Sequence, residues 1–403
     1  MLAPLSLTPS FGFGDRLGLA TPGHIAALRG TKFAPIFAQQ SVRENARTGR
    51  TPQQVMDDAK RAVEAAKWDA PWGADADHLK TIDDIHPFVK AGYTFFTVDP
   101  GEHVDNFADT YPIDILKQKA AMVNWDELSA LYLHQNGGKA LGQFAKFPMG
   151  EAESLMRAVV KYDRAIQHAA EMYRRIAELS PRPSGEGHGE GFDFEVSVDE
   201  TDSPTTPLEH FYIASELTRL GVKFTSLAPR FIGRFEKGVD YIGDLSALDI
   251  ELAKHAAVTT HFGTYKLSLH SGSDKFSVYP LVAKHWGERI HVKTAGTSYL
   301  EALRVLAKHE PDLFAKIYSL GRECYEIDKR TYHVSAQLDL LPNSNDLPSL
   351  LDDFHAREVL HVTFGSAIGQ FGVELKAALA KHEAAYYEGL RTHFEKHLSL
   401  LKD

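Results

Sequence analysis

The stretch FEVSVDE at residues 194–200 decides the predicted fold. Successive side chains of a β-strand point to opposite faces of its sheet, so the phenylalanine and the two valines share one face. The opposite face carries Glu195, Ser197 and Asp199. Two carboxylates on one face do not suit an apolar core, because a buried charge is costly without a partner. We therefore expect a strand of a closed barrel, with its polar face turned toward the lumen.

The same alternation recurs in four other segments. Apolar residues alternate there with Thr97 and Asp99, with Lys266, Ser268 and His270, with His291 and Lys293, and with His361 and Thr363. A closed sheet brings the ends of its strands around one axis, and barrel enzymes carry their catalytic groups at the C-terminal strand ends. The polar stripes therefore predict one shared site that contains Asp99, Asp199, His270, Lys293 and His361.

Strand-like and amphipathic helical stretches alternate along the whole chain. The main strand candidates are 11–20, 71–77, 93–99, 192–200, 222–228, 264–271, 289–294 and 359–364, with a ninth, shorter one near 33–40. This alternation is typical of a parallel α/β fold, and we predict a TIM-type (β/α)8 barrel that spans residues 1–403 as one domain.

Two segments depart from the alternation. Residues at about 115–180 are predicted to form a helical insertion that ends in a long helix at 151–179 and is followed by an exposed loop at 181–190. The last 32 residues are rich in Ala, Leu, Glu and Lys and predict C-terminal helices that close the barrel or contact a second subunit, so a homo-oligomer is an expectation.

Helix starts are marked by capping boxes. Thr51, Thr206 and Ser298 each precede a Glu or Gln by three residues. In such a box the hydroxyl accepts from one free amide, and the longer side chain accepts from another. Gly92 and Gly221 each follow a helical stretch, as C-terminal caps do.

Composition excludes several classes of protein. The 403 residues carry a formal charge of −10 with acidic and basic residues interleaved, so a nucleic-acid partner is not expected without a basic stripe. A single cysteine, Cys324, excludes an intramolecular disulfide. No secretory signal and no apolar stretch of about 18 residues is present, which predicts a cytoplasmic protein that does not span a membrane.

The predicted site has the chemistry of a divalent cation centre. Carboxylates and neutral imidazoles without cysteine suit zinc, manganese, nickel or cobalt. The expected ligands are Asp199, His270 and His361, with Glu195 or Glu200 as a fourth. Such an ion would polarise a ketone and a neighbouring hydroxyl and stabilise an enediolate.

Proton transfer then falls to the other titratable groups, which are Lys293 and the remaining carboxylate, Asp99 or Glu200. A structural alternative stays open, in which Glu195 forms a buried ion pair with Lys266 or Lys293 that holds the barrel together.

Two polar stretches are candidates for substrate contact. Residues 271–275 follow His270 directly and place Asp274 and Lys275 where they could bind substrate hydroxyls or a carboxylate. Gln39 and Gln40 begin a polar run after an apolar one and could contact a sugar. A plain exposed turn explains either stretch equally well.

Four colinear segments resemble the tagaturonate epimerase family. They are SFGFGDRLGLATPGH at 10–24, QQSVRENARTGRTPQQVMDDA at 39–59, SVDETDSPTTP at 197–207 and KLSLHSGSDKFSVYP at 266–280. The resemblance runs from about residue 10 to the end. It implies a metal-dependent barrel that interconverts tagaturonate and fructuronate, and in some members tagatose and fructose. Asp199, Glu200 and His270 lie in the matching segments.

The reaction implied by this resemblance inverts a carbon β to a ketone, whose hydrogen is not acidified. Retro-aldol cleavage, rotation of the aldehyde fragment and re-addition is therefore the expected mechanism. A transient redox step would need a nicotinamide, and Gly12, Gly14 and Gly18 lack the dinucleotide-binding spacing.

Arg16, Lys275 and Arg230 are alternative partners for a substrate carboxylate. Two other functions stay open from the sequence. One is a metal-dependent aldose–ketose isomerase or 3-epimerase that removes a proton α to the carbonyl, and the other is a non-catalytic sugar-binding barrel.

Overall fold

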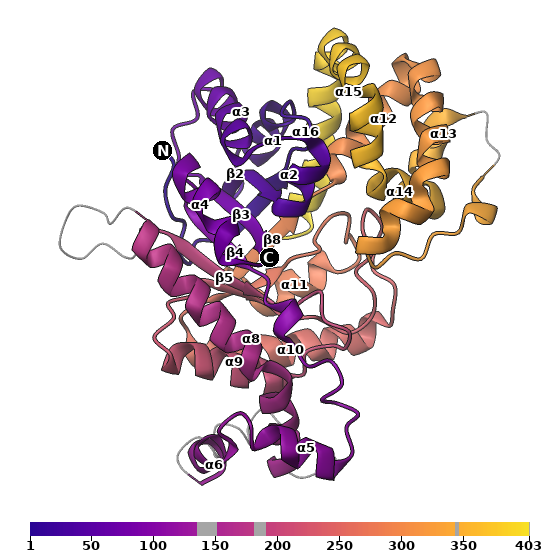
Figure 1. Ribbon diagram of the computed structural model, residues 1–403. Coiled ribbons are helices and arrows are strands. Elements are labelled where there is room, and N and C mark those ends of the chain that lie inside the picture. The colour runs from indigo at the N-terminus through magenta and orange to yellow at the C-terminus, as the bar shows by residue number, and fades with distance from the viewer. Residues whose placement is uncertain (135–150, 181–190, 343–345, 403) are drawn as a thin grey trace.

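Eight parallel strands close into a barrel in chain order, and the last strand pairs with the first (Figure 1). The computed structural model describes residues 1–134, 151–180, 191–342 and 346–402. The strands are β1 (Ser10–Gly14), β2 (Ala34–Ser41), β3 (Gly73–Leu79), β4 (Phe95–Val98), β5 (Asp193–Ser197), β6 (Ser226–Ala228), β7 (Lys266–Leu269) and β8 (Ile290–Thr294). The predicted (β/α)8 barrel is thus confirmed. That the chain forms one domain stays a prediction.

One strand prediction was wrong. The short candidate at 33–40 is β2, whereas residues 359–364 are helical and belong to α14 (Phe354–Val362) and the start of α15 (Phe364–Lys381). Asp353 caps α14 by accepting a hydrogen bond from the Ala356 amide at 2.9 Å. The buried residues Ala356, Val359 and Leu360 follow helical spacing, which a six-residue window is too short to reveal. His361 therefore lies on a helix.

The inward direction of the polar stripes is visible in contacts across the lumen. Lys293 Nζ on β8 lies 2.6 Å from an Asp75 oxygen on β3 and 2.9 Å from a Glu195 oxygen on β5. Neither strand is a neighbour of β8 in the sheet. The ion pair between Glu195 and Lys293 that the sequence left as an alternative is therefore present. On the outer side, Phe194, Val196 and Val198 belong to the main hydrophobic core.

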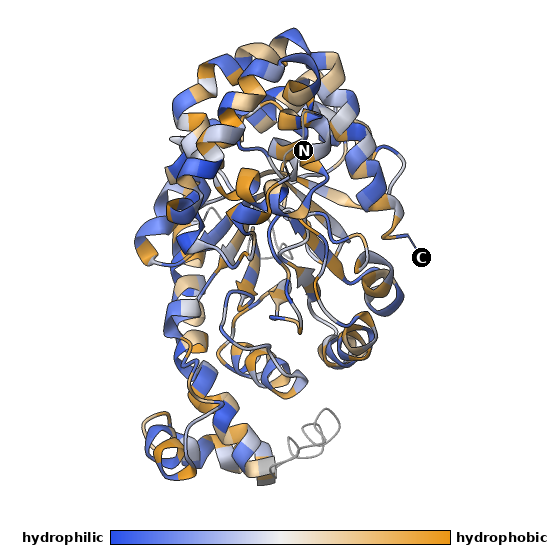
Figure 2. Cartoon of the chain, turned by 90° about the vertical axis from the view of Figure 1, so that its right-hand side faces the viewer, coloured by the Kyte–Doolittle hydropathy of each residue, from blue (hydrophilic) through white to orange (hydrophobic). Residues whose placement is uncertain are grey.

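Helices surround the barrel, and each carries hydrophilic and hydrophobic residues, as amphipathic helices do (Figure 2). Those described are α1 (Thr21–Leu28), α2 (Val42–Thr48), α3 (Pro52–Ala65), α4 (Ile82–Ala91), α5 (Ile113–Ala120), α6 (Trp125–Ser129), α8 (Glu151–Leu179), α9 (Pro207–Arg219), α10 (Leu245–Phe262), α11 (Tyr279–Trp286), α12 (Thr297–His309), α13 (Pro311–Asp328), α14, α15 and α16 (Glu383–Ser399). Short 3₁₀ turns lie at Gly101–His103, Lys329–Thr331, Leu338–Leu340 and Leu347–Leu351, and a π-helical turn at Ala130–His134.

The predicted helical insertion lies between β4 and β5. Its helices α5 and α6 extend away from the barrel, while the long helix α8 returns along it (Figure 1). Residues 135–150 and the loop predicted at 181–190 lie outside the described residues. At the other end of the chain, α16 packs against α1 and α12. The Phe394 ring of α16 lies 5.0 Å from Phe13 and 4.9 Å from His24, so the C-terminal helix covers part of the barrel.

Two of the three predicted capping boxes form. Thr51 and Thr206 cap α3 and α9, and each helix has proline in its first turn. The third prediction was wrong, because α12 begins at Thr297 with Gly296 as its cap. A side chain at position 296 would meet the Nε2 atom of His361 at 2.0 Å, so the close packing of α14 requires glycine there. The Ser298 hydroxyl instead contacts His24 at 2.8 Å.

Replacement of Thr51 by Ala tests the capping of α3. The Thr51 hydroxyl accepts from the Gln54 amide at 3.2 Å at an exposed site, so the change removes the cap without disturbing the core. We expect T51A to lower the free energy of unfolding by about 1 kcal/mol, measured by urea titration with circular dichroism. T51S retains the hydroxyl and should match the wild type. Equal midpoints for T51A and the wild type would contradict the assignment.

Candidate active site

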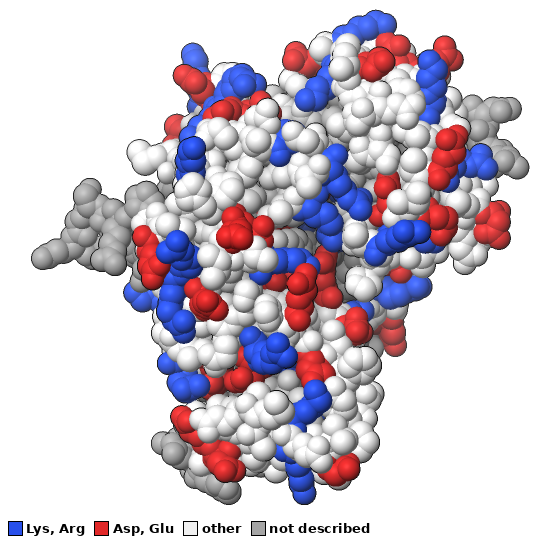
Figure 3. Space-filling view, viewed as in Figure 1, with Lys and Arg blue, Asp and Glu red and all other residues white. Residues whose placement is uncertain are grey.

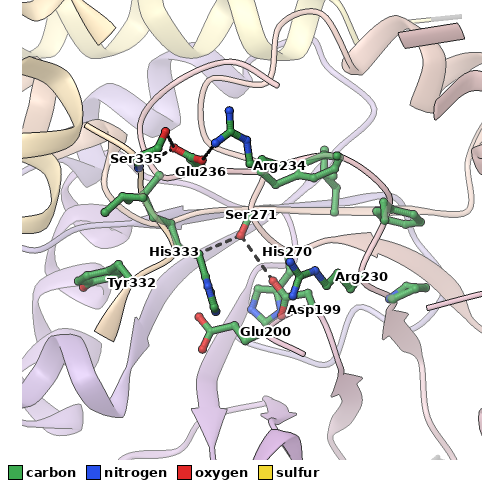
Figure 4. Close-up of a pocket in the computed structure, with 17 residues that line it drawn as sticks. Asp199, Glu200, Arg230, Arg234, Glu236, His270, Ser271, Tyr332, His333 and Ser335 are labelled. Carbon is green, nitrogen blue, oxygen red and sulfur yellow. Dashed lines mark hydrogen bonds and ion pairs between the residues drawn. The ribbon is translucent and has the colours of Figure 1, made fainter. Parts of the chain in front are cut away.

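A cavity of about 300 Å³ opens beyond the C-terminal ends of β5, β6 and β7 (Figure 4). Asp199 and Glu200 follow β5, Arg230 follows β6, and His270 follows β7; the segment 332–335 forms the facing wall. A second cavity of about 30 Å³ shares His270, Lys237 and Tyr332 with the first and is lined further by Arg16, Gln39, His78, Lys293 and His361. This is the end of the barrel at which the sequence predicted a shared site.

Two stacked imidazoles form the centre of the site. The rings of His78 and His270 lie 4.4 Å apart. His270 places Nε2 at 2.9 Å from an Asp77 oxygen, while its Nδ1 faces Ser197 at 2.7 Å and Asp199 at 3.3 Å. His78 places Nδ1 at 3.3 Å from Asp99. Each imidazole is thus oriented by a carboxylate, the arrangement that commonly positions a histidine ligand.

A break in strand alternation brings His78 into the site. Asp75 and Asp77 of β3 share the lumen face, so a regular strand would turn His78 outward. The pairing of β3 with β4 shifts register between Ala76 and Leu79, and His78 has φ 53°. This left-handed conformation is uncommon outside glycine and often occurs at functional sites. It lets two consecutive residues, Asp77 and His78, serve one site.

The charge at this centre favours a cation. Burial lowers the pKa of His270, but Asp199 and Asp77 outweigh it and raise the pKa to about 10. Burial likewise lowers the pKa of His78, but the charges of Asp77 and Glu200 and the hydrogen bond to Asp99 together raise it above its ordinary value. Imidazoles hold a proton this strongly only where carboxylates are in excess. The donor set therefore suits a divalent cation of the kind that binds nitrogen and oxygen together.

Among the described residues, three groups of potential ligands have atoms within 4.8 Å of one another. Two lie at this centre and share His78; they are Asp77, His78 and His270, and His78, Asp99 and Glu200. The third, formed by Asp274, His393 and His397, lies elsewhere. Of the predicted ligands, His270 and the possible fourth ligand Glu200 belong to these groups, whereas Asp199, His361 and Glu195 do not.

His361 lies in the smaller cavity. Both of its ring nitrogens are buried without a hydrogen-bond partner in the described part of the chain. Burial, followed by the nearby charge of Arg16, lowers the pKa of His361 far below its ordinary value, so the ring is neutral. A neutral, unpartnered imidazole in a cavity wall is available to a ligand.

Lys293 is held as an ammonium ion. Its Nζ atom lies within 2.9 Å of oxygens on Asp75, Asp77 and Glu195. Burial lowers the pKa of Lys293, but these charges, Asp75 first, raise it well above its ordinary value. A group that keeps its proton at neutral pH is no general base. The geometry therefore favours charge balance over the predicted proton transfer.

The other predicted residues divide between the cavities and their surroundings. Glu200 lines the larger cavity and pairs with Arg43 at 3.2 Å. Arg16 and Gln39 line the smaller one, with Arg16 paired to Glu44 at 2.8 Å. Gln40 lines neither cavity; its side chain donates to Thr48 and accepts from Arg50.

Asp274 and Lys275 are not brought to either cavity. Both are buried, and Lys275 Nζ donates to three backbone carbonyls, those of Glu236, Val239 and Ser273. The Asp274 carboxylate pairs with Arg357 at 3.0 Å and with His393 at 2.6 Å. Asp274 and Lys275 therefore lie in neither an exposed turn nor the wall of either cavity, because their charged groups are already paired inside the protein. Ser271, at the start of the same stretch, does line the larger cavity.

Sequence reasoning missed Asp77, His78 and Lys237. For Asp77 a signal existed, since Ala74 and Ala76 alternate with two aspartates just as apolar and polar residues alternate in the other strands. His78 breaks the alternation, and Lys237 lies in a loop without periodicity.

A closed (β/α)8 barrel with imidazoles and carboxylates gathered in a cavity at its C-terminal strand ends has the architecture of a barrel enzyme. The chain belongs to the tagaturonate epimerase family, whose model (UxaE, tagaturonate epimerase) matches residues 3–401. It is an enzyme of the isomerase class, a carbohydrate epimerase.

Named relatives cover almost the whole chain. The tagaturonate/fructuronate epimerase of Thermotoga maritima is 42% identical, over 98% of this chain and 81% of the relative. A glycerol-complexed crystal structure of fructuronate-tagaturonate epimerase from Cohnella laeviribosi is 40% identical with a TM-score of 0.89, over 98% of this chain and 81% of that one. Its native structure is 39% identical with a TM-score of 0.87 and the same coverage.

Acidic and basic side chains are interspersed over the face shown in Figure 3. None of the described helices combines the length and apolar character needed to cross a membrane.

A pair of glutamates fixes the facing wall of the larger cavity. Glu358 accepts from the Ser335 and Ala336 amides at 3.0 and 2.8 Å, and Glu236 accepts from the Ser335 amide at 2.9 Å. Burial, followed by the adjacent Glu236, raises the pKa of Glu358 to about 8. Folding therefore favours the protonated form of Glu358.

The sign of the resulting pH dependence follows by linkage. An unfolded Glu loses its proton near pH 4.3, whereas folded Glu358 keeps it until about pH 8, so stability falls as pH rises between these values. Glu358→Gln keeps an acceptor and a donor without this titration. We expect its melting temperature to exceed that of the wild type at pH 8 by roughly 2 °C or more, and the gap to shrink at pH 5. The control E374Q, at an exposed site on α15, should have the same melting temperature as the wild type at both pH values. A difference between E358Q and the wild type that does not change with pH would contradict the assignment.

Proposed function

We propose that this chain interconverts tagaturonate and fructuronate by inverting the hydroxyl-bearing carbon β to the ketone. Its membership of the family and its 42% identity to a relative named for that activity support this substrate pair. The observation that carries the proposal is the paired imidazole and carboxylate centre beside a cavity of about 300 Å³, a volume within the usual range of ligand pockets. Tagatose and fructose, which have the same ketone without the carboxylate, are proposed as secondary substrates.

A divalent cation is proposed at the centre of the site. His78 and His270 would hold it together with Asp77, because these three offer atoms within 4.8 Å of one another. Asp99 and Asp199 would orient the two imidazoles from the far side of each ring. When bound, the ion would stabilise negative charge on the ketone oxygen and the adjacent hydroxyl oxygen of the substrate.

Glu200 is the proposed proton carrier. It lines the larger cavity, and its ion pair with Arg43 favours the carboxylate form that a base requires. Lys293 would keep Asp77 in place by charge balance. His361, which is neutral and unpartnered in the described residues, would contact a substrate hydroxyl from the smaller cavity.

With the ketone carbon numbered C2, the inverted carbon is C4. Glu200 accepts the proton of the C4 hydroxyl, the C3–C4 bond breaks, and its electron pair moves toward the ketone. A three-carbon enediolate and an aldehyde result. The aldehyde rotates to present its other face, C3 attacks it again, and Glu200 returns the proton to the C4 oxygen. No external oxidant or reductant is required.

The competing enzymatic reading is an isomerase or 3-epimerase that removes a proton α to the ketone. The same cation and base would also serve this α-proton reaction. The two reactions are therefore distinguished by whether a C–H bond of the substrate is broken. A non-catalytic sugar-binding barrel is disfavoured because the titratable groups are gathered in one cavity. The homo-oligomer stays a prediction.

Turnover in deuterated water distinguishes the two enzymatic reactions. Retro-aldol epimerisation leaves the C3–H and C4–H bonds intact, so fructuronate formed from tagaturonate should carry no deuterium at either carbon by NMR. Substrate incubated without enzyme provides the control for spontaneous exchange. A C3 epimer or an aldose that carries solvent deuterium, formed in place of fructuronate, would overturn the retro-aldol mechanism in favour of α-proton removal.

Substitution of the imidazoles tests the cation site. We expect His78→Ala and His270→Ala each to lose most of the bound metal, measured per chain by elemental analysis, with activity falling at least about 100-fold while circular dichroism stays unchanged. H285A removes a histidine from a surface pair with Asp249 and should retain both metal and turnover. Full metal occupancy in H78A would show that the ion is held elsewhere.

A further inference from the structure

The loop after β6 presents Arg230 to the larger cavity from a fixed backbone position. The Arg230 amide donates to the Thr205 hydroxyl at 3.1 Å, and the Arg230 carbonyl accepts from the Thr205 amide at 2.8 Å. Thr205 itself is fully buried. The two strand-end loops therefore hold each other, and the position from which the Arg230 side chain starts is rigid.

The guanidinium of Arg230 has no protein partner in the part of the chain that is described. It takes part in no hydrogen bond or ion pair there, and its Nη1 atom is buried. Other arginines around the two cavities differ: Arg43 pairs with Glu200 at 3.2 Å and Arg234 with Glu236 at 3.3 Å. Figure 4 shows the Arg230 side chain extending toward the middle of the cavity, on the side of Asp199 and His270.

An unpartnered buried donor is expensive, and more so when it is charged. A protein keeps such a group where a ligand supplies the missing acceptor. The planar fork of a guanidinium matches a carboxylate, to which it can donate two parallel hydrogen bonds. Lys237, which also lines the cavity, already donates to Ser271 at 3.0 Å and offers only a point charge.

We propose that Arg230 determines substrate specificity by binding the carboxylate of a ketohexuronate. The inference rests on the proposed function and adds the substrate's orientation. The carboxylate end points toward β6 and Arg230, while the ketone end points toward His78 and His270.

The test compares fructuronate with fructose, which lacks the carboxylate, in Arg230→Met, Arg230→Lys and Arg234→Met. We expect R230M to lower kcat/KM for fructuronate about 100-fold, mainly through KM, and to change that for fructose by less than about 3-fold. R230K should recover part of the loss. R234M is the matched control from the same loop, and it should affect both substrates to the same extent.

Binding measured by calorimetry separates this inference from the proposed function. Wild-type protein should bind fructuronate more tightly than fructose, and R230M should lose that preference while keeping its fold by circular dichroism. Wild type that binds fructuronate without epimerising it would defeat the proposed function, and the R230M binding result would still decide the role of Arg230. Equal losses for both sugars in R230M, unchanged fructuronate affinity, or a selective loss in Lys237→Met alone would overturn the assignment.

Discussion

The ammonium group of Lys293 is the interaction on which the interior of the barrel depends. It lies within 2.9 Å of carboxylates on Asp75, Asp77 and Glu195, and so connects β8 to β3 and β5 across the lumen. Removing one partner of a buried charge network leaves the others uncompensated, which is far more costly than the net benefit of forming it. The residues that fill the lumen of this barrel are therefore constrained in charge as well as in volume.

The active-site geometry follows from this charged layer. Below it, Leu5, Ile36 and Phe95 form a small apolar cluster. Above it, Asp77 takes part in both the Lys293 network and the contact with His270 at 2.9 Å. A carboxylate held by an ion pair on one side presents a fixed oxygen on the other, which is the pre-organisation that binding and catalysis require. The same strand then departs from its regular pairing and adds His78, at a backbone conformation that a scaffold must enforce.

Much of this arrangement could be predicted from the chain, and the failures share a cause. Alternation correctly assigned Glu195, His291 and Lys293 to the lumen, because regular strands obey it. It misassigned residues 359–364, where a helix carries a similar short pattern. It also passed over His78, because the pairing of β3 with β4 shifts register there and the alternation is interrupted. The substrate role expected for Asp274 and Lys275 failed for a related reason. Their partners, such as Arg357 and the Glu236 carbonyl, come from other parts of the chain, so the local sequence does not reveal that both residues are buried.

The sequence by itself determined the fold class, the family and the residue types of the site, because hydrophobic periodicity, capping residues and motif segments are properties of neighbours along the chain. Only the tertiary structure decided which of those residues meet. The pairing of Asp77 and His78 with His270, the confinement of Lys293 and the unpartnered guanidinium of Arg230 join segments far apart in the chain. Distances of that kind depend on strand register, bulges and loop anchoring, which no local pattern encodes.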